Sequence, residues 1–309
     1  MDDPVEQVRL QEILPQHTWQ DPRVILRYRR RRALGHLVAV LAVVCIVIVL
    51  SPLLDIAFMF FYRGALAISI PNLAMTSSDG GLANAIVGTL LITALAGLVA
   101  IPIGVIGGIY LAEFSGQSRY AQSIRFIADV LSGVPSILLG YISFVIFILY
   151  FGWGRGGVGS GGSLLAGAIA LSVLMLPYVL RTTELSLRKV PNSLREAATA
   201  LGATKAQMIN RMTLILALPG ILTGVILSAS IAIGETAPLL ITAGNSNYYS
   251  ACLTSCPTSY LTYLIWNFVT SANSINGESL AYLSVFLLMS FVIGLNIIAR
   301  VGLRRFSKI

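Results

Sequence analysis

Two features of this sequence could do chemistry, and the first is an acidic residue in an apolar stretch. Glu235 follows Gly234 and precedes Thr236 in a run that has no lysine or arginine nearby. A carboxylate in apolar surroundings is expensive, so it is a candidate for binding a passing solute. A second interpretation stays open, in which neighbouring backbone and hydroxyl groups satisfy Glu235 within the fold.

The second feature is the segment 132–136, which reads Ser-Gly-Val-Pro-Ser. Proline removes an amide and disfavours helix at the residue before it, so a helix should split or bend here. A half-helix that begins at Pro135 would direct free N–H groups and its positive end toward an anion. Glycine and proline also occur in membrane helices for packing alone, so this interpretation has a structural alternative. Five residues are the candidates for a solute pathway: Ser132, Gly133, Ser136, Glu235 and Thr236.

A polar segment at 190–204 predicts a short helix between two apolar runs. Ser193 and Glu196 have the spacing of a capping box, in which each side chain bonds the other residue's amide. Gly202 is expected to end the helix in the left-handed conformation. A helix of about two turns is too short to be stable alone, so it must pack on its own chain or on a partner.

Enzymatic chemistry finds no support in the sequence. It contains no phosphate-binding Gly-x-x-x-x-Gly-Lys-Ser/Thr loop, no nucleophile–base pair and no metal-ligand cluster, and both histidines, His17 and His36, lie in or beside the N-terminal arm. The three cysteines do not have zinc or redox spacing. We expect Cys45 to be a small buried apolar residue. A disulfide between Cys252 and Cys256 is left open. We therefore expect a non-enzyme without metal or cofactor.

The elements that position these residues are membrane spans. Hydrophobic residues make up 56% of the 309 residues and charged residues 11%, and the mean hydropathy is +0.82. Such a composition is typical of an all-α, polytopic membrane protein. The net charge of +8 comes from basic residues that flank the apolar runs, so we expect no nucleic-acid partner. We expect six spans, with the third broken at 132–136 and the fifth kinked or interrupted at Pro219 and Pro238: 34–62, 82–112, 124–151, 164–187, 209–243 and 280–303.

The distribution of positive charge predicts the orientation. Of the 21 lysine and arginine residues, only Arg63 and Arg155 fall in the loops of one side. By the positive-inside rule, both termini and the loop 188–208 are cytoplasmic. The expected organisation is a cytoplasmic segment, 1–33, followed by a transmembrane domain, 34–309.

Two further carboxylates have structural explanations. Asp55 lies late in the first span, where we expect it to be interfacial and solvated. Asp129 follows Arg125 by four residues, so an ion pair within one helix is expected.

The 190–204 segment also carries a family resemblance. Glu196, Ala197 and Ala198, followed by three residues and Gly202, resemble the coupling loop of ABC-importer permeases. In that family, the helix fits a groove on a cytoplasmic ATPase and carries its closing motion into the spans. Flanking strings resemble the phosphate-import permeases of the PstA family over roughly residues 80–300: 84–89, 133–137, 176–184, 218–224 and, most specifically, 234–240.

The resemblance implies a type I ABC importer permease fold in the cytoplasmic (inner) membrane. It implies three partners: a second permease of PstC type, an ATPase dimer of PstB type that binds the ATP, and an extracytoplasmic phosphate-binding protein of PstS type. The residues implied to contact the ATPase are Ser193, Glu196, Ala197, Ala198 and Gly202. Glu235 could then accept the proton of hydrogen phosphate, which sulfate lacks, or it could lock helices together.

Two departures leave other functions open. A proline is common in the family where Ile215 stands, and an arginine is usual where Ile231 stands, four residues before Glu235. Loss of that cation makes import of another oxyanion an alternative. An ATPase-independent secondary transporter or channel is a further alternative, although no inverted repeat supports it.

Overall fold

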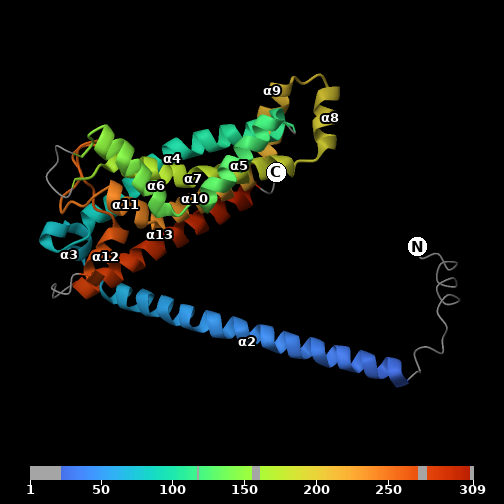
Figure 1. Cartoon of the computed structure of the whole chain (residues 1–309), viewed down its shortest axis with the longest axis horizontal. Coiled ribbons are helices and arrows are strands. Elements are labelled where there is room, and N and C mark those ends of the chain that lie inside the picture. The colour runs from blue at the N-terminus through green and yellow to red at the C-terminus, as the bar shows by residue number, and fades with distance from the viewer. Residues whose placement is uncertain (1–21, 117, 155–160, 271–276, 307–309) are drawn as a thin grey trace. The chain divides into compact units, whose positions relative to one another are not determined.

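A computed structural model describes residues 22–116, 118–154, 161–270 and 277–306, and these residues form helices and no strand (Figure 1). The expected all-α fold is confirmed. The chain divides into two compact units, 1–59 and 60–309. The described part of the first unit belongs to helix α2, Pro22–Leu66, which continues into the second unit.

Cys45 is exposed on α2, so the expectation that it is buried was wrong. The α2 span is strongly apolar, and none of its most apolar window is buried. In a membrane, lipid tails would surround an apolar side chain on such a helix and take the place of a protein interior.

The second unit is an assembly of helices, and a long irregular segment joins α11 to α12. Three stretches, η3, η4 and η5, are π-helical, and η2 is a 3₁₀ turn. The elements after α2 are α3 (Ile70–Ala74), η2 (Ser77–Asp79), α4 (Ala83–Ile109), η3 (Tyr110–Phe114), α5 (Arg119–Gly133), α6 (Ser136–Ser143), η4 (Phe144–Tyr150), α7 (Leu164–Arg188), α8 (Asn192–Ala200), α9 (Lys205–Met208), η5 (Ile209–Thr213), α10 (Leu214–Gly234), α11 (Ala237–Thr242), α12 (Leu261–Thr270) and α13 (Gly277–Phe306).

Five helices of the described residues are long and apolar enough to cross a membrane, and one bent pair could make a sixth span. The five are Leu34–Leu66, Ala83–Phe114, Leu164–Arg188, Lys205–Gly234 and Gly277–Val301. The bent pair, Arg119–Gly133 and Ser136–Tyr150, turns by 102° at the segment where the sequence predicted a break.

The fifth span differs from its expected course. It ends at Gly234, not at 243, and the break falls at Glu235 and Thr236. Pro219 lies inside α10 without interrupting it, whereas Pro238 lies in the first turn of α11. A proline in the first turn removes no helical hydrogen bond, which is why Pro238 marks a beginning and not a kink.

Small residues let the central helices α4, α7 and α10 pack closely. Gly108 of α4 lies against Thr183 of α7, and Gly224 of α10 lies against Thr182, so that a Cβ at either glycine would overlap its neighbour. Close backbone approach through small residues is the usual way in which membrane helices associate. The core cluster between these helices draws on Ile92, Ala96, Ala100, Leu164, Ala168, Leu171, Met175 and Ala232.

The two ends of the second unit carry different loops: α8 and α9 lie at one end, and α3 and α12 lie at the other (Figure 1). Residues 84–89, at the beginning of α4, form hydrogen bonds with segments at the α12 end of the unit. Asn84 Oδ1 accepts from the Ser77 amide, and Asn84 Nδ2 donates to the Ser246 carbonyl, each at 2.9 Å. Thr89 Oγ1 accepts from the Leu261 amide at 2.9 Å. This string therefore has a structural role.

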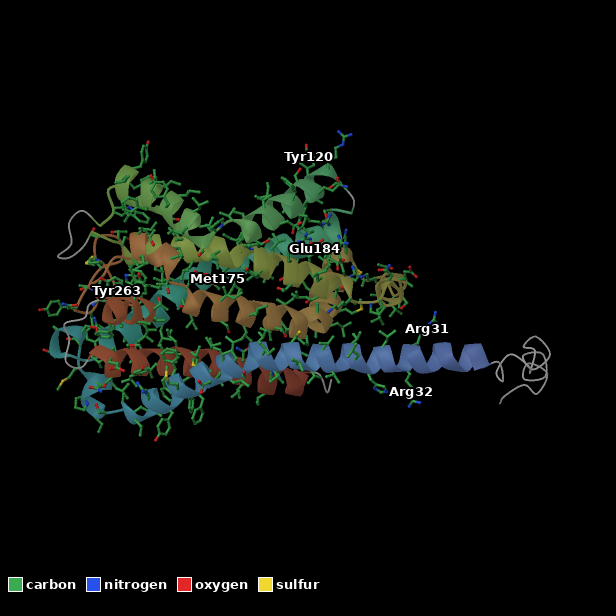
Figure 2. The ribbon with its side chains drawn as sticks, turned by 60° about the horizontal axis from the view of Figure 1, so that its bottom comes forward. Arg31, Arg32, Tyr120, Met175, Glu184 and Tyr263 are labelled. Atoms are coloured by element: carbon green, nitrogen blue, oxygen red, sulfur yellow. A yellow bond between two sulfur atoms is a disulfide. The ribbon has the colours of Figure 1, made fainter. Side chains whose placement is uncertain are left out.

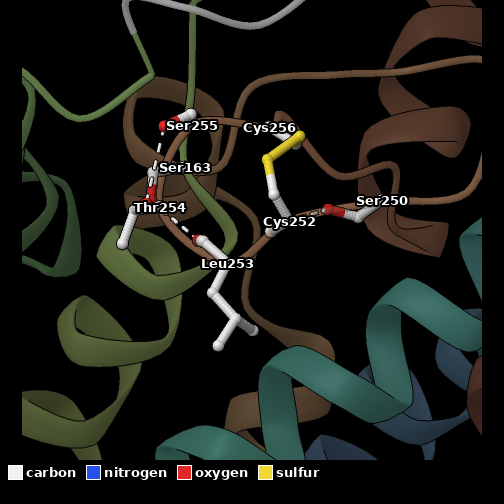
Figure 3. Close-up of a disulfide and its surroundings, with 7 residues drawn as sticks. All are labelled: Ser163, Ser250, Cys252, Leu253, Thr254, Ser255 and Cys256. Carbon is white, nitrogen blue, oxygen red and sulfur yellow. Dashed lines mark hydrogen bonds between the residues drawn. A yellow bond between two sulfur atoms is a disulfide. The ribbon is translucent and has the colours of Figure 1, made fainter.

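A disulfide joins Cys252 to Cys256, with the Cα atoms 5.4 Å apart, which answers the question that the sequence left open (Figure 3). The bridged turn docks on the beginning of α7. The Leu253 carbonyl accepts from the Leu165 amide at 2.9 Å and from Ser163 Oγ at 3.2 Å.

We expect Cys252→Ser to lower the stability of the second unit. Closing a loop of this sequence separation is worth about 2 kcal/mol in the chain-entropy account. The midpoint of thermal unfolding in detergent should fall accordingly, and a reductant should reproduce the fall in the unchanged chain. Cys45→Ser is the matched control, because that thiol is unbridged. Equal midpoints for the two variants would contradict the prediction.

Candidate transport site and coupling helix

The two broken helices of the second unit meet at their breaks. Gly140 of α6 lies directly against the backbone of Pro238 in α11, and a Cβ at residue 140 would overlap it. Each of the longer helices ends at a glycine, Gly133 or Gly234, and the next residue is extended. The same pattern therefore occurs twice: one helix ends at a glycine, and the next begins next to a proline. The two breaks lie side by side inside the fold.

A cavity of about 210 Å³ lies at these breaks. It brings together Ser132, Ser136 and Glu235, which were proposed from the sequence as one pathway although they are far apart in the chain. Gly133 and Thr236, the other two pathway candidates, are not among its lining residues. Ile231, one of the two departures noted in the sequence, does line it. The lining residues are Leu131, Ser132, Val134, Ser136, Leu139, Leu174, Tyr178, Ile231 and Glu235.

The half-helix expected at the first break is present. The α6 helix begins at Ser136 after Pro135, and no side chain caps its first amides. Uncapped amides and the positive end of the helix dipole favour an anion beside them. Because Ser136 also lines the cavity, these amides are near a space that an anion could occupy.

Glu235 is not inside a helix, which corrects the expectation of a residue deep in a span. It is the residue at the end of α10, and its extended backbone accepts a hydrogen bond from Thr262 Oγ1 at 2.9 Å. In the described part of the chain, its carboxylate has no hydrogen-bond or ion-pair partner. The half-buried carboxylate is therefore available to a solute in the cavity.

A larger cavity of about 500 Å³ lies elsewhere, between α4, α7, α10 and α13. Its lining is almost wholly apolar, and its one hydroxyl, on Thr93, already donates to the Thr89 carbonyl. An anion placed there would lose its hydration without compensation, so the smaller cavity is the better candidate.

A buried charge cluster on α7 was not foreseen. The side chain of Glu184 is 2% exposed and receives three arginines: Arg125 Nε at 2.7 Å, Arg188 Nη2 at 2.9 Å and Arg181 Nη1 at 3.4 Å. Figure 2 labels Glu184, Met175 and Tyr263 in turn, from the α8 end of the unit toward the opposite end. The sequence did contain a signal for this cluster: Glu184 has an arginine three residues before it and another four residues after it in one apolar span.

Asp129 pairs with Arg181 of α7, with Nη2 2.6 Å from Oδ1 and from Oδ2. The expected pair with Arg125 within α5 was wrong, because Arg125 instead reaches Glu184 of α7. Two hydrogen bonds from one guanidinium across helices are stronger than a single exposed contact along one helix.

The helix expected at 193–202 is present as α8, but its beginning differs. Pro191 precedes the helix and no side chain caps it, so the capping box of Ser193 and Glu196 was wrong. Ser193 is already the second helical residue, and a cap must precede the helix. A capping box does occur one helix later, between Thr204 and Gln207 at the start of α9.

The end and the surface of α8 agree with the sequence. Gly202 has a φ of +80°, as expected for a left-handed helix stop. No residue of α8 is buried, and Glu196 and Ala197 are exposed, while Ala198 is half-buried. The helix offers a free surface of small side chains at the end of the unit.

The sequence matches the family described as "Binding-protein-dependent transport system inner membrane component" over residues 104–308. The chain therefore belongs to the inner-membrane permeases of binding-protein-dependent transport, and it is a multi-pass membrane protein. Its fold is also that of solved ABC importers. A structure of the MetNI methionine transporter matches 77% of this chain and 99% of its own at TM-score 0.60 and 20% identity, and a bacterial importer of alginate matches 91% and 98% at TM-score 0.62 and 13% identity.

Within that class, the chain belongs to the PstA family. It is 39% identical over 281 residues to "Phosphate transport system permease protein PstA 2" of Mycobacterium bovis, covering 88% of this chain and 90% of the relative. It is 41% identical over 229 residues to PstA of Yersinia pestis, covering 73% of each. It is 36% identical over 283 residues to PstA of Haemophilus influenzae, covering 89% and 95%.

Proposed function

We propose that this chain is the permease subunit of an ATP-driven importer of inorganic phosphate and forms half of the translocation pathway. The observation that carries the proposal is the identity of about two residues in five with phosphate permeases along nearly the whole chain. ATP would be bound and hydrolysed by a separate subunit, so this chain would itself catalyse nothing.

The cavity at the two breaks would hold the anion during its passage. Hydrogen phosphate retains a proton at neutral pH, and the Glu235 carboxylate would accept it in a hydrogen bond. Ser132 and Ser136 would donate to the phosphate oxygens, together with the first amides of α6. Sulfate has no proton to offer, so the same carboxylate would repel it.

The positive charge of this site requires a further source. No lysine or arginine is among the residues that line the cavity, and Ile231 supplies none. The helix end of α6 would balance part of the anion's charge. A cation from a second permease of PstC type would balance the rest, because the pathway would lie between two such subunits.

The α8 helix would be the contact with an ATPase dimer of PstB type. Its exposed small residues allow a groove to approach closely, and Gly202 fixes where the helix stops. Such a contact would place α8 and, by the positive-inside rule, both termini in the cytoplasm. The disulfide-bridged loop at the opposite end would then face an extracytoplasmic binding protein of PstS type, where oxidising conditions preserve the bridge.

Co-purification of the tagged chain tests the assembly, and stimulation of ATP hydrolysis tests the substrate. We expect a second permease and an ATPase to accompany this chain, and we expect phosphate with its binding protein to stimulate hydrolysis. Stimulation by another oxyanion in place of phosphate would favour the alternative that Ile231 suggests. Solute uptake that persists without any ATPase would instead indicate a secondary transporter.

A further inference from the structure

The side chain of Arg195 links α8 to two other elements of the second unit. None of the α8 residues is buried as a whole, and short turns join the helix to α7 before it and to the four-residue helix α9 after it. Arg195 differs from the exposed residues of α8, because its side chain is only 18% exposed and points back to the end of α4. There it meets Glu113, whose side chain is 2% exposed.

The contact of Arg195 joins three elements at one point. Its Nη1 lies 2.5 Å from both carboxylate oxygens of Glu113, in η3, and its Nη2 donates to the Leu187 carbonyl at the end of α7 at 2.7 Å. A buried charge that loses its partner is strongly unfavourable, so any movement of α8 must either carry η3 along or break this pair.

The same π-helical turn is linked to the helix that leads to the cavity. The Leu111 carbonyl, two residues before Glu113, accepts from Arg125 Nη2 of α5 at 3.1 Å. Near the other end of α5, Asp129 is paired with Arg181 of α7, and the Asp129 carbonyl accepts from Ser132 Oγ at 2.8 Å. Ser132 lines the cavity.

We infer that Glu113 and Arg195 are positioning residues that transmit movement of α8 through η3 to α5 and so to the cavity. A π-helical turn holds one residue more than an α-helical turn and is frequent at functional sites. The Arg195–Glu113 ion pair and the hydrogen bond from Arg125 to the Leu111 carbonyl both hold η3, so η3 is the element that would shift. The inference rests on the proposed function. It concerns how movement passes from α8 to the cavity, not the contact between α8 and the ATPase.

Contiguity alone does not establish coupling, so the test must be energetic. The variants are Glu113→Gln, Arg195→Gln, their combination, and Arg195→Lys. Each single glutamine leaves one buried charge unpaired and should lower the unfolding midpoint. The combination leaves no charge unpaired, so its midpoint should recover.

Coupling should behave differently from stability. In the reconstituted complex, we expect phosphate carried per ATP to fall about tenfold in both single glutamine variants and to stay low in the combination, because the charged link is absent from all three. Stimulation of hydrolysis by the loaded binding protein should fall with it. Arg195→Lys should retain most of the coupling. Arg119→Glu, a charge reversal at an exposed arginine, is the control and should leave both quantities unchanged.

A purely structural role makes the opposite prediction for the combination. If coupling recovers together with the unfolding midpoint, Glu113 and Arg195 serve stability only and the inference is wrong. If the unchanged complex carries no phosphate, the proposed function fails on its own account, and stimulation of hydrolysis still decides the inference.

Discussion

Glu235→Gln is expected to lower phosphate uptake about 30-fold or more while the complex still assembles. A carboxylate accepts the proton of hydrogen phosphate more strongly than a neutral amide oxygen does, and a hydrogen bond to a charged group is worth about 2 kcal/mol. The carboxylate has no hydrogen-bond or ion-pair partner in the described part of the chain. Its replacement therefore leaves no other group unpaired, and the fold should tolerate the change. Uptake of labelled phosphate and co-purification of the partners measure the two effects.

Glu278→Gln is the matched control for that variant. Glu278 is 75% exposed and pairs with Arg63, itself 52% exposed, at 3.2 Å. An exposed pair contributes little, so this change should leave uptake unaltered. Normal phosphate uptake by the Glu235 variant would contradict the role proposed for that carboxylate. Loss of assembly would instead support the alternative in which Glu235 locks helices together.

Glu184→Ala is expected to destabilise the second unit by about 2–3 kcal/mol, because three arginines then lose charge-assisted hydrogen bonds to one buried carboxylate. Arg125 and Arg188 both bind Oε1 of Glu184, and Arg181 would keep only Asp129. The change should appear as a large fall in the unfolding midpoint of the purified chain, and as reduced yield from the membrane.

Glu278→Ala provides the comparison for this prediction, since it removes an exposed acid from an exposed pair and should cost less than about 1 kcal/mol. Glu184→Gln should fall between the two, because the amide oxygen still accepts a hydrogen bond. A Glu184→Ala chain as stable as the Glu278→Ala chain would show that the arginines find other partners and that the cluster is not a structural centre.

The sequence predicted the parts of the site that depend on local chemistry. Glycine and proline act on their own segment of chain, so the break at 132–136 and the left-handed stop at Gly202 followed from residue type alone. The predicted pathway residues Ser132, Ser136 and Glu235 proved to share one cavity, because each lies at a helix break, and breaks gather where irregular backbone is sheltered by protein.

The parts that depend on contacts between distant segments could not be predicted. The spacing of Arg125 and Asp129 suggested a pair within α5. Because α7 packs against α5, Arg125 pairs with Glu184 of α7 and Asp129 pairs with Arg181 of α7 instead. The link from Arg195 to Glu113 joins α8 to η3, which are far apart in the sequence, so no spacing rule could indicate it. The cap of α8 failed for a local reason: Pro191 starts the helix before Ser193 can cap it.

Uptake of labelled phosphate into proteoliposomes that contain the complete complex is the most direct test of this account. The binding protein is added on the outer side, and ATP is either enclosed with the ATPase or omitted. We expect phosphate to accumulate only with ATP and sulfate in excess to leave that uptake unchanged. Accumulation without ATP, or equal uptake of sulfate, would contradict an ATP-driven phosphate permease.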